Sequence, residues 1–214
     1  MTISLDENHF EANEFRKAAF NFYNRKNILN FSNNPNFVVH INRVLNSIKD
    51  NLNINGNHLF NSQPACRYLE NIFNNPRLNN IIIKKLYLIN HLLNWKVNEN
   101  YRNVYPQHFF ENESFVEIIG PNGLLLASDI RVGFLLMGKN VFYPSHSHEA
   151  LELYNIINGK SLWQINFNNF EEKNKNDIIF HDIWEPHAMK TTDETVLALF
   201  SWSGNITSEA IPIK

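Results

Sequence analysis

Apolar residues follow two different periods along the chain. Over the first hundred or so residues they recur at three- and four-residue steps, which is typical of helices that bury one face. Four helical stretches are predicted, with inward-facing positions within Phe10–Tyr23, Val38–Ile48, Tyr68–Phe73 and Ile82–Leu93. Pro35 should end the first stretch. Pro64 and Pro76 should open the third and fourth, because the first turn of a helix does not need the missing N–H group of proline.

From about Phe115 the pattern changes to short runs of β-prone residues separated by turn signals. The predicted strands are Phe115–Ile119, Leu124–Ala127, Val132–Met137, Val141–Tyr143, Glu152–Ile157, Ser161–Phe167, Ile178–Phe180 and Thr195–Trp202. Asn158-Gly159 stands between two of these runs and predicts a type I′ hairpin. Many short strands favour an antiparallel sandwich or barrel. We therefore expect a helical region over residues 1–110 packed on a β-barrel over residues 111–214.

Composition narrows the class of protein. The 214 residues are 43% apolar and 13% aromatic, which suits one folded domain with an extension. A net charge of −2 argues against broad binding to nucleic acid or acidic membrane. The single cysteine, Cys66, excludes an intrachain disulfide and a thiolate-rich metal site. The apolar runs are far shorter than the ~20 residues of a membrane span. The first residues lack the basic and apolar regions of a signal peptide, so a cytoplasmic location is expected.

The segment from Tyr143 to Tyr154 carries the most informative polar residues. His146, His148, Glu152 and Tyr154 are separated by even numbers of residues, so in one unbulged strand all four would point into the barrel. Glu149 has the opposite parity and should face outward. Two imidazoles and one carboxylate are ligands of intermediate hardness, which suit Zn, Fe, Mn, Ni or Co.

A fourth ligand is needed from elsewhere in the chain, and His187 is the best candidate. Burying such polar groups with neither a metal nor hydrogen bonds would cost several kcal/mol. This favours one divalent transition metal at the cluster. The remaining histidines are interpreted as hydrogen-bonded core or surface residues; they are His9, His40, His58, His91, His108 and His181.

The spacing of these residues resembles the two cupin motifs. The first reads His-x-His, three residues, Glu, six residues, Gly, which here is His146, His148, Glu152 and Gly159. The second places a histidine ten residues after an aspartate, as His187 follows Asp177, although Asn176 replaces the usual opening glycine. The resemblance implies a mainly β cupin fold, a double-stranded β-helix or jelly-roll barrel. With the N-terminal α-helical extension the chain would be α+β overall.

A narrower resemblance is to the cupin dimethylsulfoniopropionate (DMSP) lyases. It rests on the string His-x-His-x-Ala-x-Glu-x-Tyr followed by Asn-Gly and Trp163, and on Pro186–Thr191 running into Leu197–Gly204. Lys190 stands where arginine is expected. The implied reaction is a metal-dependent β-elimination that converts DMSP into dimethyl sulfide and acrylate, with the metal binding the substrate carboxylate.

The elimination needs a base near the α-carbon of the substrate, and Tyr154 is the candidate because it follows Glu152 by two residues. The resemblance implies the same role for this tyrosine. Tyr143 also matches a family active-site position and could hold or polarise the substrate. Trp163 and Trp202, and more weakly Phe134, could present aromatic faces to the sulfonium group.

Other functions are compatible with the same ligand set. A dioxygenase or an isomerase could use the metal, and a non-catalytic small-molecule-binding cupin could use the N-terminal helices to bind DNA. The Lys and Arg residues of these helices do not gather on one face, which argues against DNA as a partner. The helices could instead form the surface of a homodimer.

Overall fold

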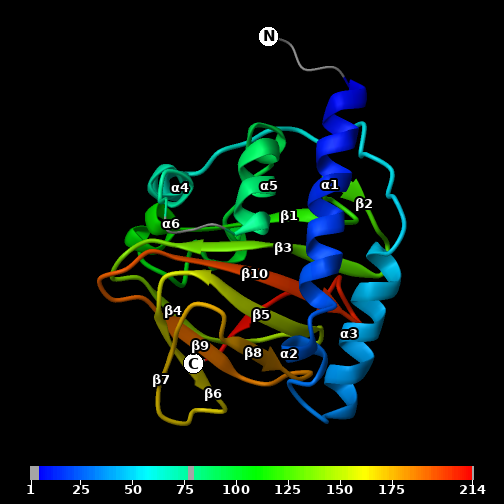
Figure 1. Cartoon of the computed structure of the whole chain (residues 1–214). Helices are drawn as coiled ribbons and strands as arrows, with labels where there is room; N and C mark the ends of the chain where they lie inside the picture. The colour runs from blue at the N-terminus through cyan, green and yellow to red at the C-terminus, as the bar shows by residue number, and fades with distance from the viewer. Residues whose placement is uncertain (1–4, 77–79, 214) are drawn as a thin grey trace.

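The computed structural model describes residues 5–76 and 80–213, and its first half is mostly helical (Figure 1). The α-helices are α1 (Leu5–Tyr23), α2 (Lys26–Leu29), α3 (Pro35–Ile48), α4 (Leu69–Phe73), α5 (Ile81–Ile89) and α6 (Gln107–Asn112). Short 3-10 helices are η1 (Pro64–Tyr68), η2 (Asn90–Leu92) and η3 (Glu99–Tyr101). Within the described part of the chain, no helix is both long enough and apolar enough to cross a membrane.

Two helix boundaries and one inward-facing position differ from the predictions. Pro35 opens α3 and does not end the first helix, which stops at Tyr23. The fourth helix begins at Ile81, where the Asn80 side chain accepts a hydrogen bond from a backbone N–H of the first turn, so Pro76 does not open it. Phe10 is 61% exposed and does not share the buried face of α1.

The second half forms two β-sheets. The six-stranded sheet has the order β2-β1-β3-β10-β5-β8, from β1 (Glu113–Gly120), β2 (Leu125–Leu126), β3 (Ile130–Met137), β5 (Leu151–Asn158), β8 (Ile178–His181) and β10 (Val196–Ser203). The five-stranded sheet has the order β11-β4-β9-β6-β7, from β4 (Phe142–Ser147), β6 (Ser161–Ile165), β7 (Glu171–Lys173), β9 (His187–Lys190) and β11 (Ile211–Pro212). Apart from β1 and β2, the paired strands are antiparallel.

The six-stranded sheet is buried on both faces. Its outer face packs on α1, α3 and α5 (Figure 1), where the rings of Phe15 and Phe134 lie 6.0 Å apart. Its inner face meets the five-stranded sheet in a second core that contains Leu135, Tyr154 and Met189. The helices therefore lie on the outside of the barrel. The domain division at residue 110 stays a prediction.

Asn158-Gly159 does not form a hairpin, and this prediction is wrong. β5 pairs with β10 and β8, whereas β6 pairs with β9 and β7, so the turn connects opposite sheets. Gly159 still needs its φ of +80°, and a Cβ there would come 2.2 Å from the carbonyl oxygen of Thr195. The dipeptide thus indicates a sharp turn but not which strand its neighbours pair with.

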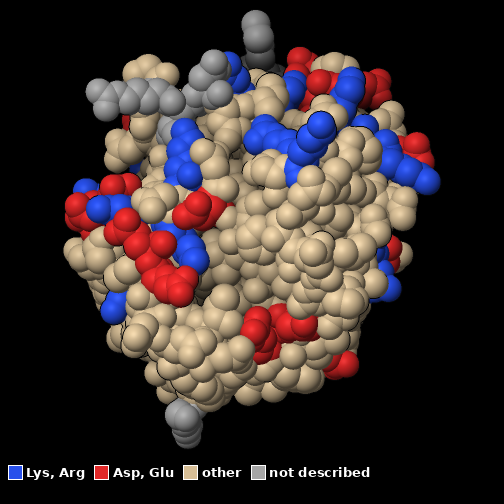
Figure 2. Space-filling view, turned by 60° about the horizontal axis from the view of Figure 1, so that its bottom comes forward, with Lys and Arg blue, Asp and Glu red and all other residues tan. Residues whose placement is uncertain are grey.

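Charged side chains are mixed on the face of the molecule seen in Figure 2. Lys and Arg lie among Asp and Glu mostly in the upper and left parts of this view, and a broad uncharged area occupies its middle. No continuous basic patch is visible on this face.

One buried histidine links the helical layer to the barrel and makes stability depend on pH. His40 of α3 lies 2.8 Å from the hydroxyl oxygens of Ser201 and Ser203 in β10. Burial lowers the pKa of His40 to about 3. The unfolded chain therefore binds a proton that the folded chain excludes, and stability should fall as the pH drops from about 6.5 toward 3, by on the order of 4 kcal/mol.

We expect His40→Asn to reduce this acid dependence, because an amide can keep a hydrogen bond to a serine but cannot take up the proton; other buried histidines such as His146 keep their share of it. Urea unfolding measured between pH 4 and pH 7 would show it. His91→Asn, at an exposed position, is the matched control, and its free energy of unfolding should change with pH as in the wild type. Equal slopes for wild type and His40→Asn would contradict the assignment.

Candidate active site

The four predicted ligands come from both sheets. His146 lies near the end of β4 and His187 at the start of β9, and these two residues are paired across the five-stranded sheet. Glu152 belongs to β5 of the six-stranded sheet, and His148 lies in the turn between β4 and β5. All four side chains are buried, and Glu149 is exposed.

The cluster was predicted on the assumption that all its residues within 146–152 lie on one continuous strand, and this assumption is wrong. β4 ends at Ser147 and β5 begins at Leu151, so His146 and Glu152 do not lie on one continuous strand. The side chains converge because the chain passes from one sheet to the facing sheet between them, and both point into the space enclosed by the barrel.

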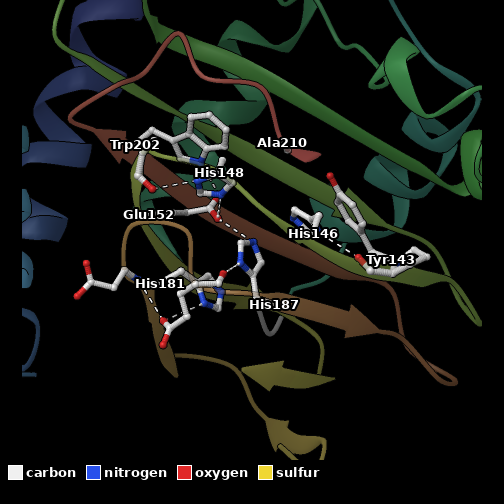
Figure 3. A network of polar contacts seen from close by, with 12 residues as sticks. Tyr143, His146, His148, Glu152, His181, His187, Trp202 and Ala210 are labelled. Carbon is white, nitrogen blue, oxygen red and sulfur yellow. Dashed lines mark hydrogen bonds and ion pairs between the residues drawn. The ribbon is translucent and has the colours of Figure 1, made fainter. Parts of the chain in front are cut away.

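Three of the four residues form a tight group. Ligand atoms of His148, Glu152 and His187 all lie within 4.8 Å of one another. Glu152 Oε2 is 3.0 Å from Nε2 of His148 and 3.3 Å from Nε2 of His187 (Figure 3). His146 is not part of this group, although its ring centroid is 4.2 Å from that of His187. This trio could hold a metal ion.

Backbone carbonyls fix the orientation of all three motif imidazoles. The Nδ1 atoms of His146, His148 and His187 each lie 2.9 Å from a backbone carbonyl oxygen. A carbonyl only accepts, so each Nδ1 carries the proton, and in a neutral ring Nε2 presents its lone pair. Nε2 of His187 is buried and has no hydrogen-bond partner among the described residues. Lone pairs that converge on a carboxylate oxygen fit a divalent cation placed among them.

The protonation states agree with such a site. Although burial alone would favour the protonated acid, positive charge on the imidazoles of His148 and His187 holds the pKa of Glu152 well below its usual range; when these rings are neutral, a bound cation would supply that charge. Burial, reinforced by the neighbouring His187, lowers the pKa of His146 well below its usual value. The carboxylate is therefore ionised and the His146 ring is neutral, which are the forms that bind metals.

Two aromatic side chains fix the positions of the ligands. Trp202 of β10 donates from Nε1 to Glu152 Oε1 at 2.5 Å, and its ring lies 4.1 Å from that of His148. The other carboxylate oxygen, Oε2, is left to face the histidines. His181 of β8 stacks on His187 with ring centroids 3.9 Å apart and an angle of 9° between the planes. Nothing in the sequence indicates that His181 lies directly against His187, a predicted ligand.

A cavity of about 340 Å³ opens beside this cluster. Its wall includes Glu152 together with three other predicted site residues, Tyr143, Tyr154 and Trp202. Trp163 does not line it, since it lies behind Tyr154, with ring centroids 4.9 Å apart. Phe134 faces the helices on the other side of the sheet, so the expectation that it points inward is wrong.

Burial determines the protonation state of the two tyrosines on the cavity wall. It raises the pKa of Tyr154 well above its usual value, and the nearby charge of Glu152 adds to the effect. Burial likewise raises the pKa of Tyr143, whose ring stacks on His146 at 4.3 Å. In the protein alone, both hydroxyl groups are therefore protonated at neutral pH.

The structure adds residues that the sequence did not single out. Glu113 and Arg131 line the cavity wall from β1 and β3. The mouth is bounded by residues 207–210 and by Asn98 and Asn100. Tyr101 joins the two sides of the mouth, because its hydroxyl donates to the carbonyl oxygen of Ala210 at 3.2 Å. The helical half of the chain thus contributes to the site, which its helical periodicity did not indicate.

Two facing sheets that enclose a His-x-His and Glu cluster, with a further histidine from a later strand, define a cupin-type barrel. The family model described as dimethylsulfoniopropionate lyase matches residues 38–198, so the chain belongs to the DMSP lyase family. This is a family of carbon–sulfur lyases, the enzyme class that the sequence predicted.

Individual relatives support the same family. The dimethylsulfoniopropionate lyase DddQ of Ruegeria pomeroyi strain DSS-3 is 28% identical over 96 residues, which cover 45% of this chain and 47% of that protein. The chain thus matches about half the length of this curated relative.

Solved structures match over nearly the whole chain. A chain from the crystal structures of the DMSP lyases RdDddP and RnDddQII has a TM-score of 0.74 at 17% identity, covering 97% of this chain and 100% of its own. The crystal structure of DddQ from Ruegeria pomeroyi DSS-3 has a TM-score of 0.72 at 18% identity, with coverages of 93% and 95%. The predicted fold, a mainly β cupin barrel with N-terminal helices, is confirmed.

Proposed function

We propose that this protein is a DMSP lyase that converts dimethylsulfoniopropionate into dimethyl sulfide and acrylate by β-elimination. The observation that carries the proposal is the group formed by His148, Glu152 and His187, which adjoins a cavity also lined by Tyr154. Membership of the family supplies the substrate class. The cavity volume of about 340 Å³ is enough for a substrate of this size.

His146 is proposed as the fourth ligand of a divalent transition metal, with Fe, Zn, Mn, Ni and Co as the candidates. Its Nδ1 donates to a backbone carbonyl as in the other two histidines, and its ring adjoins that of His187. When bound, such an ion supplies Lewis acidity toward the substrate carboxylate and favours the ionised form of a neighbouring phenol.

Tyr154 is proposed as the base. In its ionised form, which a bound divalent cation would favour, its phenolate oxygen takes the α-proton and becomes a neutral hydroxyl. The electrons of the C–H bond form the C=C bond, and the C–S electrons leave with sulfur. The sulfonium departs as neutral dimethyl sulfide, so no acid is required. Tyr143, on the same wall, is proposed to hold the substrate in place.

Trp202 is proposed to present its face to the sulfonium group, since it lines the cavity. A direct contact between Trp163 and the substrate stays a prediction, as does a homodimer formed through the helices. The hydrogen bond from Trp163 Nε1 to Ser161 Oγ, at 2.8 Å, fixes the ring that backs Tyr154.

The function is tested by incubating metal-loaded protein with DMSP and measuring dimethyl sulfide in the headspace and acrylate in solution. Equal amounts of the two products, without oxygen consumption, are expected. Oxygen uptake would favour a dioxygenase instead, and the absence of both products would reject the lyase.

Trp202→Phe should weaken metal binding about tenfold while keeping the ring against His148. The reason is that the variant removes the hydrogen bond that orients Glu152. Competition with a chromogenic chelator measures the metal affinity. Trp95→Phe removes a comparable indole hydrogen bond, to Asn90 in the helical layer, and should leave the affinity unchanged. Equal affinities in both variants would show that the Trp202 hydrogen bond does not matter.

A further inference from the structure

Glu113 is a buried acid on the cavity wall, and one of its carboxyl oxygens has no hydrogen-bond partner among the described residues. It is the first residue of β1 and is 2% exposed. Its Oε2 atom is buried and makes no hydrogen bond to any described residue. Burial raises the pKa of Glu113 to about 8, so in the protein alone the carboxyl is mostly protonated at neutral pH, and a cation bound beside it would favour the ionised carboxylate. A buried carboxyl without a partner destabilises a fold, so a ligand is the natural source of the missing contact.

The neighbouring acid on the same strand face shows the contrast. Glu117 also lines the cavity, but its Oε2 lies 3.4 Å from Nε of Arg131. Its Oε1 accepts a hydrogen bond from the backbone N–H of Asn122 at 2.7 Å. Glu117 therefore has both a cation and a hydrogen-bond donor within the protein, whereas Oε2 of Glu113 has no hydrogen-bond donor among the described residues.

The cavity as a whole favours positive charge. Among its described lining residues Arg131 is the sole Lys or Arg, and it is already paired with Glu117. Apolar and aromatic side chains line the same wall; they include Phe115, Leu135 and Tyr143. A methylated onium group suits these surroundings, because it carries a permanent positive charge but has no N–H or O–H group to donate.

We propose that Glu113 is the counter-charge for the sulfonium group of the substrate and makes the site selective for methylated cations. The proposal rests on the proposed function, because it assigns one end of the same substrate. Glu152 and Glu113 line one continuous cavity, so a substrate whose carboxylate is held at the group of His148, Glu152 and His187 would turn its sulfonium toward Glu113. Glu113 is thus a specificity-determining residue and takes no proton from the substrate.

The chemistry of the leaving group gives this role a distinct kinetic signature. The positive charge on sulfur disappears as the C–S bond breaks. A counter-charge therefore stabilises the bound substrate more than the transition state. In Glu113→Gln, KM for DMSP should rise about tenfold or more while kcat stays the same or rises. Structural damage to the site would lower kcat instead.

Binding of two isosteric carboxylates tests the proposal without turnover. The first is trimethylammonio-propionate, whose amine is a poor leaving group. The second is its neutral analogue, in which a carbon atom replaces the nitrogen. Calorimetry on metal-loaded wild-type protein should show a preference for the cation of about tenfold or more. In Glu113→Gln, the two affinities should differ by no more than about twofold, chiefly because the variant binds the cationic carboxylate more weakly.

Glu209→Gln is the matched control, because Glu209 lines the mouth of the same cavity but is exposed to water. It should keep the wild-type preference. If Glu113→Gln does not fold, Glu113→Met fills similar space without a charge and should show the same loss.

The outcomes separate the two proposals. Wild-type protein that binds both carboxylates equally, or a Glu113→Gln variant that keeps the preference, would overturn the role of Glu113 and leave the lyase intact. Wild-type protein that binds neither carboxylate and releases no dimethyl sulfide would overturn the lyase, and with it this assignment.

Discussion

Replacing Tyr154 with phenylalanine should lower kcat for DMSP by at least about a hundredfold, the usual effect of losing a general base. The variant removes one oxygen atom and keeps the ring that packs on Trp163. Tyr154 is almost fully buried on the cavity wall, so bulk water cannot easily replace its oxygen. Headspace dimethyl sulfide measures the loss, and elemental analysis should show an unchanged metal content.

Tyr105→Phe is the matched control for this variant. Tyr105 belongs to the same inner core, and its buried hydroxyl has no hydrogen-bond partner among the described residues. It does not line the cavity, so its removal should leave kcat within about twofold. If Tyr154→Phe keeps more than a third of wild-type turnover, another group is the base.

Glu152→Gln should abolish both metal binding and activity, with a loss of at least about a hundredfold in each. Its carboxylate is the only anion in the group formed with His148 and His187. The variant should still fold, because an amide N–H in place of Oε2 can donate to the lone pairs at Nε2 of the two histidines. Metal content after dialysis and dimethyl sulfide release are the two readouts.

Glu149→Gln provides the comparison at a neighbouring position. The exposed Glu149 side chain accepts a hydrogen bond from Asn205 at the surface and does not enter the cluster. Its metal content and turnover should equal those of the wild type. A Glu152→Gln protein that retained one metal per chain would remove Glu152 from the ligand set.

The proposed ligand set could be predicted from the sequence because three of its four residues lie close together in the chain. His146, His148 and Glu152 stand within seven residues, and the motif spacing records a tight crossing between two sheets. The reason first given for their convergence, parity along one strand, does not hold, since two strands and a turn carry them. His187 is the best fourth candidate among the remaining histidines and also fits the second motif spacing, but its strand, β9, is not predicted from the sequence.

The remainder of the site could not be predicted because the six-stranded sheet is buried on both faces. Alternation along β1 separates Glu113 from Val116, and along β3 it separates Phe134 from Leu135. Periodicity shows that such pairs face opposite ways, but it does not show which face meets the helices and which meets the cavity. This is why Phe134 was assigned to the wrong side and Glu113 was missed.

Because the proposed ligands are divided between the two sheets, activity depends on the two sheets staying packed together. Glu152 is anchored in the six-stranded sheet, and His187 is anchored in the facing one. Any motion that parts the sheets, even slightly, pulls the carboxylate away from the imidazole before either strand loses its own pairing. On heating, activity should therefore be lost when the two sheets separate, at a temperature at which the helical layer is still folded.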